Sequence, residues 1–218
     1  MKKFKNLAAM GLILAVCAGC GAPASAESAE KENAEDLLSA EEGVRRELFT
    51  WVPEGAPCRL SQTEALPELA AVIAETYQIP EEEWENTRYY YDYVDLNGDG
   101  DEEIFAVVMG MYTSGSGGDS GMIVLPYAGM TVKQTFTLLR MPVFVSDEST
   151  GDAKDLVFLR SGGGSEPTLV RLTSTDGVYT NPADAETIDS LEGVAGTAIL
   201  CNDLMADMES SSALTLAD

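Results

Sequence analysis

Five acidic side chains and two glycines fall within the twelve residues 93–104, which read YVDLNGDGDEEI. Asp95, Asn97 and Asp99 place oxygen donors at alternate positions, and Gly100 follows where a calcium loop needs a sharp turn. A hard cation such as calcium takes carboxylate, amide and carbonyl oxygens in this order along a loop. The spacing therefore predicts a calcium site, and the alternative is a hairpin turn whose carboxylates are only solvated.

The loop differs from an EF-hand in two respects. With Asp95 as the first position, the twelfth is Ala106, where an EF-hand has a bidentate glutamate. The flanking residues are also typical of strands and not of helices. On this pattern the loop joins two strands of a hairpin, with Tyr89, Tyr91 and Tyr93 on one face of the first strand.

A strand, a D-x-N-x-D-G-x-x-E loop and a second strand resemble the calcium loops of FG-GAP (integrin-like) and VCBS-type repeats. The resemblance covers residues 90–110 and occurs in one copy. It implies a Ca²⁺ ion held by one set of ligands: the side chains of Asp95, Asn97, Asp99 and Glu103 and the backbone carbonyl of Asp101. More widely, residues 70–201 resemble uncharacterised bacterial lipoproteins and exported proteins, a likeness that implies no activity.

The chain begins MKKFKNLAAMGLILAVCAGC, with three lysines, an apolar run and then small residues. This order is typical of a secretory signal, because the apolar run is about half the roughly 20 residues that span a bilayer. Residues 17–20 resemble the lipobox of bacterial lipoproteins. The resemblance implies that residues 1–19 are removed as a signal peptide and that Cys20 carries the lipid. Plain secretion is the alternative.

Residues 20–44 are predicted to be a flexible acidic tether, because they are rich in Ala, Ser and Glu and can bury little apolar surface. Residues 45–218 are predicted to form a single domain. Loss of the three signal lysines changes the formal charge from −24 to −27. This charge argues against nucleic acid as a partner and favours metal ions or cationic proteins, with solubility alone as the alternative explanation.

Two cysteines remain in the predicted domain, Cys58 and Cys201. Outside the cytoplasm they can form a disulfide that closes a long loop. Two buried free thiols are the alternative. Because the chain has no histidine, the two cysteines make a poor zinc site.

Apolar residues at helical spacing predict helices over residues 33–49 and 67–77, the second beginning at Pro67 and packing against a sheet. From residue 88 onward, short β-rich runs alternate with turn residues about every ten positions. The predicted fold class is α+β, with N-terminal helices followed by a mainly antiparallel β-sheet body. The pattern does not distinguish a sandwich from a propeller-like stack of sheets.

No catalytic activity is expected. Residues 118–121, GDSG, match the nucleophile segment of chymotrypsin-like proteases, but a Ser-His-Asp relay is impossible in a chain without histidine. The glycine-rich segments 113–121 and 161–165 lack the pattern of a phosphate-binding loop. They are predicted to be inter-strand loops, or else a rim that recognises a partner.

Together these features predict a lipid-anchored calcium-binding module on the extracytoplasmic side of the cell envelope, with a structural or recognition role. Its expected partners are the membrane, through the lipid on Cys20, and a protein or glycan. The alternative is an acidic inhibitor or binding antagonist of a cationic protein such as a lysozyme-like enzyme, toward which the negative charge would steer association.

Overall fold

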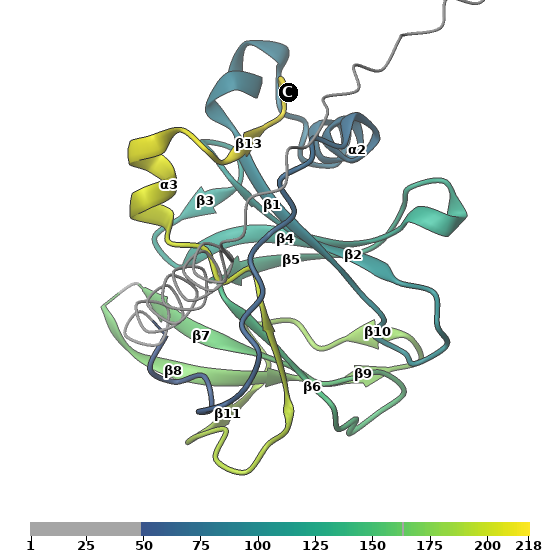
Figure 1. The fold of residues 1–218 in the computed structure, drawn as a ribbon, viewed down its shortest axis with the longest axis vertical. Coiled ribbons are helices and arrows are strands. Elements are labelled where there is room, and N and C mark those ends of the chain that lie inside the picture. The colour runs from purple at the N-terminus through teal and green to yellow at the C-terminus, as the bar shows by residue number, and fades with distance from the viewer. Residues whose placement is uncertain (1–48, 163) are drawn as a thin grey trace, which may run out of the picture. The chain divides into compact units, whose positions relative to one another are not determined.

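The computed structural model describes residues 49–162 and 164–218, shown in colour in Figure 1. The described residues belong to one compact unit. The predicted signal peptide, the predicted tether, the predicted lipidation site Cys20 and, apart from Phe49, the helix predicted over residues 33–49 lie outside them.

The first sheet is built around the hairpin of β1 (Arg88–Val94) and β2 (Glu103–Met109). On the other side of β2, the chain adds β4 (Gly118–Leu125) and then β5 (Thr131–Leu139). Two short strands complete this sheet, β13 (Leu214–Thr215) beside β1 and β3 (Ser114–Gly115) beside β4. All of these pairings are antiparallel, as the sequence predicted.

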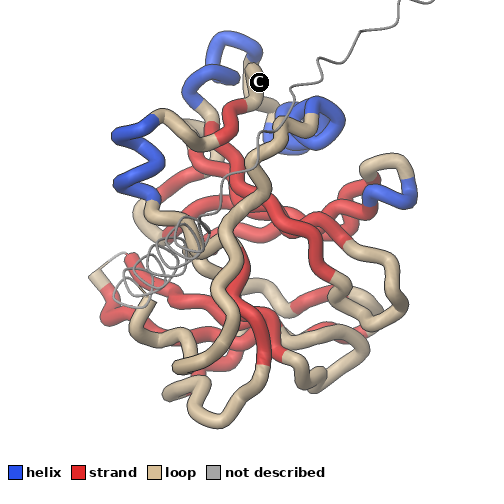
Figure 2. Tube along the Cα trace, viewed as in Figure 1, coloured by secondary structure: helices blue, strands red, loops and turns tan. Residues whose placement is uncertain are grey.

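The second sheet has the strand order β11-β8-β7-β6-β12 and is also antiparallel. Its members are β6 (Val143–Ser146), β7 (Leu156–Gly162), β8 (Ser165–Leu172), β11 (Glu186–Ile188) and β12 (Gly196–Ile199). A small ribbon of β9 (Ser174–Thr175) and β10 (Val178–Tyr179) follows β8. Figure 2 shows the strands forming the body, while the helical segments gather around the first sheet.

The main core lies between the two sheets, which pack face to face as in a sandwich. Phe105 and Phe136 from the first sheet and Phe158 from the second are all at most 1% exposed in this core. The rings of Phe105 and Phe136 stack with their centroids 6.0 Å apart. Burial of such large apolar side chains is the principal term that stabilises the fold.

The helix predicted over residues 67–77 is confirmed as α2 (Pro67–Tyr77). Its buried stripe, which includes Leu69 and Ile73, packs against Tyr89 on the outer face of the first sheet. Tyr90 lies on the opposite face, between the sheets, so the predicted alternation of side chains along β1 is confirmed.

The predicted α+β class is wrong, because helix makes up only 16% of the described residues, which are mainly antiparallel β-sheet. The other helical segments are the 3₁₀ turns η1 (Glu81–Asn86) and η2 (Pro126–Ala128) and the short helix α3 (Leu204–Ser210). Within the described ranges, no helix is both long enough and apolar enough to cross a membrane.

The sheets need few helices because they cover one another. Helix α2 covers only the outer face of the first sheet. The outer face of the second sheet is covered by irregular chain, where Trp51 and Val52 pack beside the buried Phe144 and Leu191. Loops thus bury the apolar surface of this face.

An extended segment over residues 57–62 links the two sheets along one side. Ala198 of β12 exchanges backbone hydrogen bonds with this segment, donating to the Pro57 carbonyl at 2.9 Å and accepting from the Arg59 N–H at 2.8 Å. Further along, the Gln62 N–H donates to the Tyr91 carbonyl of β1 at 2.8 Å. The same short stretch is therefore bonded to both sheets.

Three side-chain links fix this segment. Cys58 is joined to Cys201 by a disulfide. The Arg59 guanidinium lies 2.8 Å from the Asp92 carboxylate, which is only 2% exposed. Gln62 donates to the same carboxylate at 2.8 Å. The buried charge of Asp92 is therefore compensated by groups of the linking segment.

Candidate functional site

The acidic loop connects β1 to β2, and Val94 pairs with Glu103 where it closes. The Asp95 carboxylate accepts hydrogen bonds from the backbone N–H groups of Gly98 at 2.7 Å and Gly100 at 3.1 Å. Both glycines have positive φ angles, 75° and 92°, which other residues adopt only with strain. Asp95 and the glycines therefore set the tight turn that the sequence predicted.

The next polar side chains continue this pattern. Asn97 Oδ1 accepts from the Asp99 N–H at 3.0 Å, and Asp99 Oδ1 accepts from the Asp101 N–H at 2.8 Å. The amide of Asn97 also donates to Asp99 Oδ2 at 2.8 Å. The N–H of Asp101 and the amide of Asn97 lower the pKa of Asp99. Asp99 is thus kept ionised, as a metal ligand must be.

Glu103 differs from the other predicted ligands because it is fully buried. Its Oε2 accepts a hydrogen bond from the Leu96 N–H at 3.0 Å. Its Oε1 has only a long bond from the Tyr127 hydroxyl at 3.4 Å, and Lys133 Nζ lies 4.0 Å away. A buried carboxylate is costly unless cations or hydrogen-bond donors surround it. One oxygen of Glu103 is therefore weakly compensated.

The structure brings the predicted ligands into one loop but does not gather them around one point. Asn97, Asp99 and Asp101 are exposed, Asp95 is partly exposed, and Glu103 is buried. Among the residues that the structure describes, no group of three or more His, Cys, Asp and Glu side chains is placed to hold a metal ion.

The donor chemistry of the loop nevertheless fits calcium, because all the ligating groups are oxygens and most are charged. Each carboxylate oxygen that accepts one backbone hydrogen bond keeps a second lone pair. Asp99 Oδ2, which accepts from the Asn97 amide, likewise keeps a lone pair that an ion can take.

The surroundings of Glu103 could not be predicted from the loop sequence. Tyr127 follows β4 and Lys133 lies in β5, so both reach Glu103 only through sheet pairing. The local spacing of residues 95–103 contains no signal for either contact. The hydrogen bond from the Leu96 N–H to Glu103 is local in sequence. It was not predicted, because the spacing of a calcium loop assigns the oxygens of Glu103 to the ion and not to a backbone N–H group.

The GDSG segment is not a loop, because residues 118–121 lie within β4. Ser120 is buried, and its hydroxyl donates to the Thr113 carbonyl at 2.9 Å. A Cβ atom at Gly121 would collide with the Leu139 side chain and the Ala106 carbonyl. Close packing of neighbouring strands therefore explains this glycine, and Ser120 is not displayed as a nucleophile.

Asp119 in the same strand is a buried carboxylate, 9% exposed, whose Oδ1 accepts from the Ser114 hydroxyl at 2.6 Å. Burial raises the pKa of Asp119, while the bond from Ser114 and the charge of Arg140 oppose this rise. The charged form is therefore less favourable in the folded protein than in the unfolded chain.

The raised pKa of Asp119 predicts a pH dependence of stability. Between the unfolded pKa, about 3.9, and the raised folded pKa, the folded state binds more protons, so stability falls as pH rises. We expect Asp119→Asn to remove this component and to increase the free energy of unfolding at neutral pH. Urea unfolding of the parent and the variant across this pH window would measure this component. A variant whose stability changes with pH as that of the parent does would contradict the prediction.

The two glycine-rich segments meet at one edge of the molecule, although they belong to different sheets. A Cβ atom at Gly162 would collide with the backbone of Ser116 and Gly117. Arg140 lies between the segments and donates to the carbonyls of Ser116 at 3.3 Å and Ser161 at 3.4 Å. The glycines are therefore needed for close approach of two hairpins.

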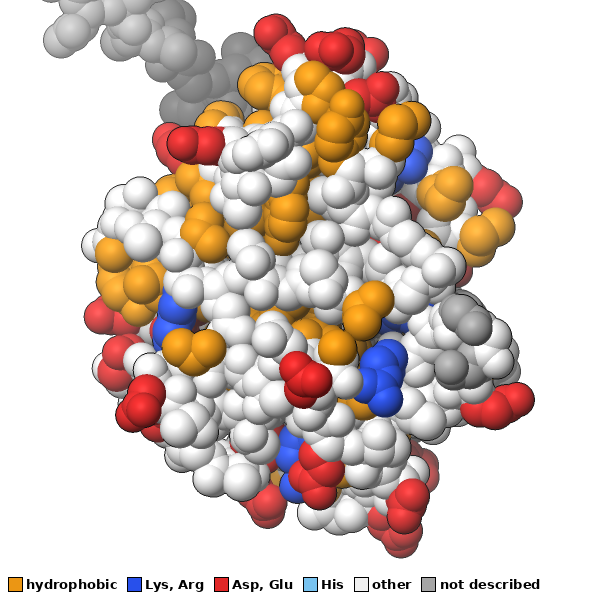
Figure 3. All heavy atoms as spheres, turned by 180° about the vertical axis from the view of Figure 1, so that it is seen from behind, with side chains coloured by type: hydrophobic (Ala, Val, Ile, Leu, Met, Phe, Trp, Pro, Cys, Tyr) orange, Lys and Arg blue, Asp and Glu red, His pale blue; other side chains and the backbone are white. Residues whose placement is uncertain are grey.

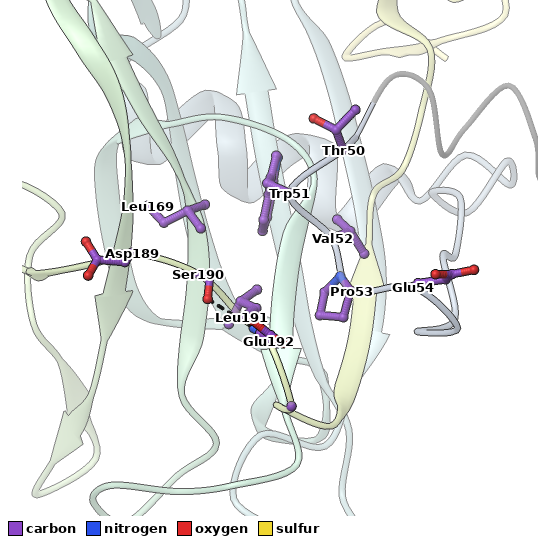
Figure 4. Close-up of a pocket in the computed structure, with 11 residues that line it drawn as sticks. Thr50, Trp51, Val52, Pro53, Glu54, Leu169, Asp189, Ser190, Leu191 and Glu192 are labelled. Carbon is purple, nitrogen blue, oxygen red and sulfur yellow. Dashed lines mark hydrogen bonds between the residues drawn. The ribbon is translucent and has the colours of Figure 1, made fainter.

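A separate hollow of about 460 Å³ lies on the outer face of the second sheet (Figure 4). Trp51, Val52 and Pro53 form one wall, and Leu191 and Glu192 lie across from them. Figure 4 shows the carboxylates of Asp189 and Glu54 directed away from Trp51. The hollow thus lacks two acids facing a common point, the arrangement that glycoside hydrolysis requires.

Because calcium-loop spacing, the hairpin and the disulfide are features of many unrelated proteins, they do not identify a family. Comparison of the chain with protein-family models, with curated proteins and with solved structures gives no match.

Proposed function

We propose that the protein is a lipid-anchored calcium-binding module on the extracytoplasmic side of the cell envelope, without catalytic activity. Calcium would bind in the loop between β1 and β2, held by Asp95, Asn97, Asp99, Glu103 and the carbonyl of Asp101. The ion would join the first two strands at their loop end and so support the sheet on which a protein or glycan partner is recognised.

The observation that carries this proposal is the environment of Glu103. A fully buried carboxylate lies directly beneath a loop of exposed acids, and its Oε1 has no cation closer than Lys133 Nζ at 4.0 Å among the described residues. A divalent cation shared by Glu103 and the loop would compensate this charge and relieve the repulsion among the loop carboxylates. The loop sequence supplies the remaining oxygen ligands.

The disulfide supports an exported location. Stable disulfides form in oxidising compartments and are rare in the cytosol. Cys58 and Cys201 are 143 residues apart in sequence and meet only because the folded chain brings the linking segment to the end of β12. This pairing agrees with the signal-like N-terminus.

The alternative role, antagonism of a cationic protein, would be favoured by acidic side chains gathered in one broad patch. On the face shown in Figure 3, acidic side chains are dispersed among neutral ones, with a few basic side chains between them. This face therefore gives the alternative no support over the calcium module.

The test uses two substitutions that remove the same charge from the same loop. Asp99→Ala removes a predicted ligand, whereas Glu102→Ala removes an exposed acid outside the predicted ligand set. We expect calcium to increase the free energy of unfolding by about 1–2 kcal/mol in the parent when its concentration is roughly ten or more times the Kd. The same gain is expected in Glu102→Ala, and almost none in Asp99→Ala.

Thermal unfolding in calcium and in a chelator would measure these differences. Magnesium at equal concentration is the ionic control, because a general effect of divalent charge would act on all three proteins alike. Equal calcium responses in Asp99→Ala and Glu102→Ala would contradict specific binding by the loop and leave it a solvated turn.

A further inference from the structure

A cavity of about 320 Å³ lies at the other end of the β1–β2 hairpin from the acidic loop. It is formed where β1 begins and β2 ends, so it adjoins the core between the sheets. Segments far apart in sequence contribute to it, including η1, the first two strands, β4 and α3. A cavity of this size is within the range of small-molecule binding sites.

The walls of this cavity are mainly apolar. Tyr90 and Met109 come from the first sheet, and Leu204 and Met208 come from helix α3. Helix α3 has no buried residue, and Met208 is 55% exposed although it lines the cavity. Methionine side chains adapt readily to the shape of an apolar ligand.

Asp119 contributes a buried carboxylate to this apolar cavity. Its Oδ1 is bonded to the Ser114 hydroxyl, but no described residue forms a hydrogen bond with its Oδ2. Arg140 lowers its pKa, yet no ion pair with Asp119 is formed within the described ranges. This second oxygen is not fully shielded from solvent, so it can accept a hydrogen bond from a ligand in the cavity.

Arg88 contributes the opposite charge from a different wall of the same cavity. Its guanidinium is partly exposed and forms neither an ion pair nor a hydrogen bond with any residue of the described part of the chain. Arg88 pairs with Met109 across β1 and β2, and the register of β2 and β4 places Asp119 beside Met109. The backbones of Arg88 and Asp119 are thus two strand spacings apart, about 10 Å.

We infer that this cavity binds a small zwitterion with an apolar body, of the class of apolar α-amino acids. The ammonium group of the ligand would donate to Asp119 Oδ2, and its carboxylate would accept from Arg88. The apolar part would pack against Met109, Leu204 and Met208. Such a ligand supplies a donor to Asp119 Oδ2 and an acceptor to Arg88, which neither group has among the described residues, within one cavity of about 320 Å³.

This site is independent of the calcium loop. The loop lies at the Val94–Glu103 end of the hairpin, whereas the cavity lies at the Arg88–Met109 end. The inference therefore holds whether or not the loop binds calcium, and its test is made in the presence of a chelator.

Three probes of similar shape separate the two charges. L-leucine carries both, 4-methylpentanoate lacks the ammonium group, and isopentylamine lacks the carboxylate. We expect calorimetric titration of the whole protein at neutral pH to show L-leucine binding about tenfold or more tightly than either analogue, since each charged hydrogen bond contributes at least this factor.

Substitutions assign each charge to its residue. Arg88→Gln should lower the affinity for L-leucine about tenfold and leave the affinity for isopentylamine unchanged. Asp119→Asn should lower the affinity for L-leucine without lowering the affinity for 4-methylpentanoate. Arg171→Gln, outside the cavity, should bind as the parent does. The inference is overturned if no probe binds, if the analogues match L-leucine, or if Arg88→Gln and Asp119→Asn bind L-leucine like the parent.

Discussion

Removal of the Cys58–Cys201 disulfide should lower the free energy of unfolding by about 5 kcal/mol, the largest effect that we expect from any single change. The two cysteines are 143 residues apart in sequence, so the bond closes nearly the whole described chain into a loop. In the chain-entropy model, the stabilisation rises with loop length because the cross-link restricts the unfolded chain. The measurement is chemical unfolding of Cys58→Ala/Cys201→Ala beside the parent.

The reductant provides the matched control. Adding it to the parent should reproduce the loss seen in the double variant, because both break the same link, and adding it to the double variant should change nothing. If reduction left the unfolding curve of the parent unaltered, the disulfide would not be a stabilising link between the segment over residues 57–62 and β12.

Phe105→Ala should cost about 4 kcal/mol of stability, through the loss of buried apolar contacts and the cavity left behind. Phe105 is 1% exposed in the core between the sheets and stacks on Phe136. The Phe136 ring in turn lies edge-on to Tyr179, with centroids 6.4 Å apart. These rings connect the first sheet to the ribbon that follows β8, so their loss should weaken both halves of the core together.

Met111→Ala is the matched control for Phe105→Ala, because Met111 is a large apolar side chain that is 79% exposed. Its substitution should change the free energy of unfolding by no more than about 0.5 kcal/mol. Urea unfolding followed by both fluorescence and circular dichroism would measure the two variants. If Phe105→Ala lost less free energy of unfolding than the control variant does, a core shared by the two sheets would be contradicted.

Much of the local structure could be predicted from the sequence because it depends on neighbouring residues. The helix over residues 67–77 was located by a proline suited to its first turn and by an apolar stripe. Alternation correctly assigned the faces of β1, and the strand-like residues on both sides of the loop correctly located the hairpin. These signals act within a few residues of one another.

The fold class could not be predicted in the same way, because it depends on what covers each sheet. The second sheet buries its inner face against the first and its outer face beneath irregular segments around Trp51 and Leu191. Nothing in the short β-rich runs indicates that loops take this place. The helix predicted from a local stripe is present, but it does not make the fold α+β.

The candidate site was predicted in part. The sequence located the turn and the side chains that accept its backbone hydrogen bonds, which are Asp95, Asn97 and Asp99. It did not indicate the contacts of Glu103 with Tyr127 and Lys133, which depend on strand pairing. The cavity between Arg88 and Asp119 was missed for the same reason, since its walls come from residues 86–208.

Direct calorimetric titration of the protein with calcium tests the central proposal. A loop of this kind in an extracytoplasmic module should bind one ion with a Kd of about 0.1–1 mM. Binding should vanish in Asp99→Ala and persist in Glu102→Ala. Absence of saturable binding by the parent up to about 10 mM calcium, ten times the upper end of that range, would contradict the calcium module.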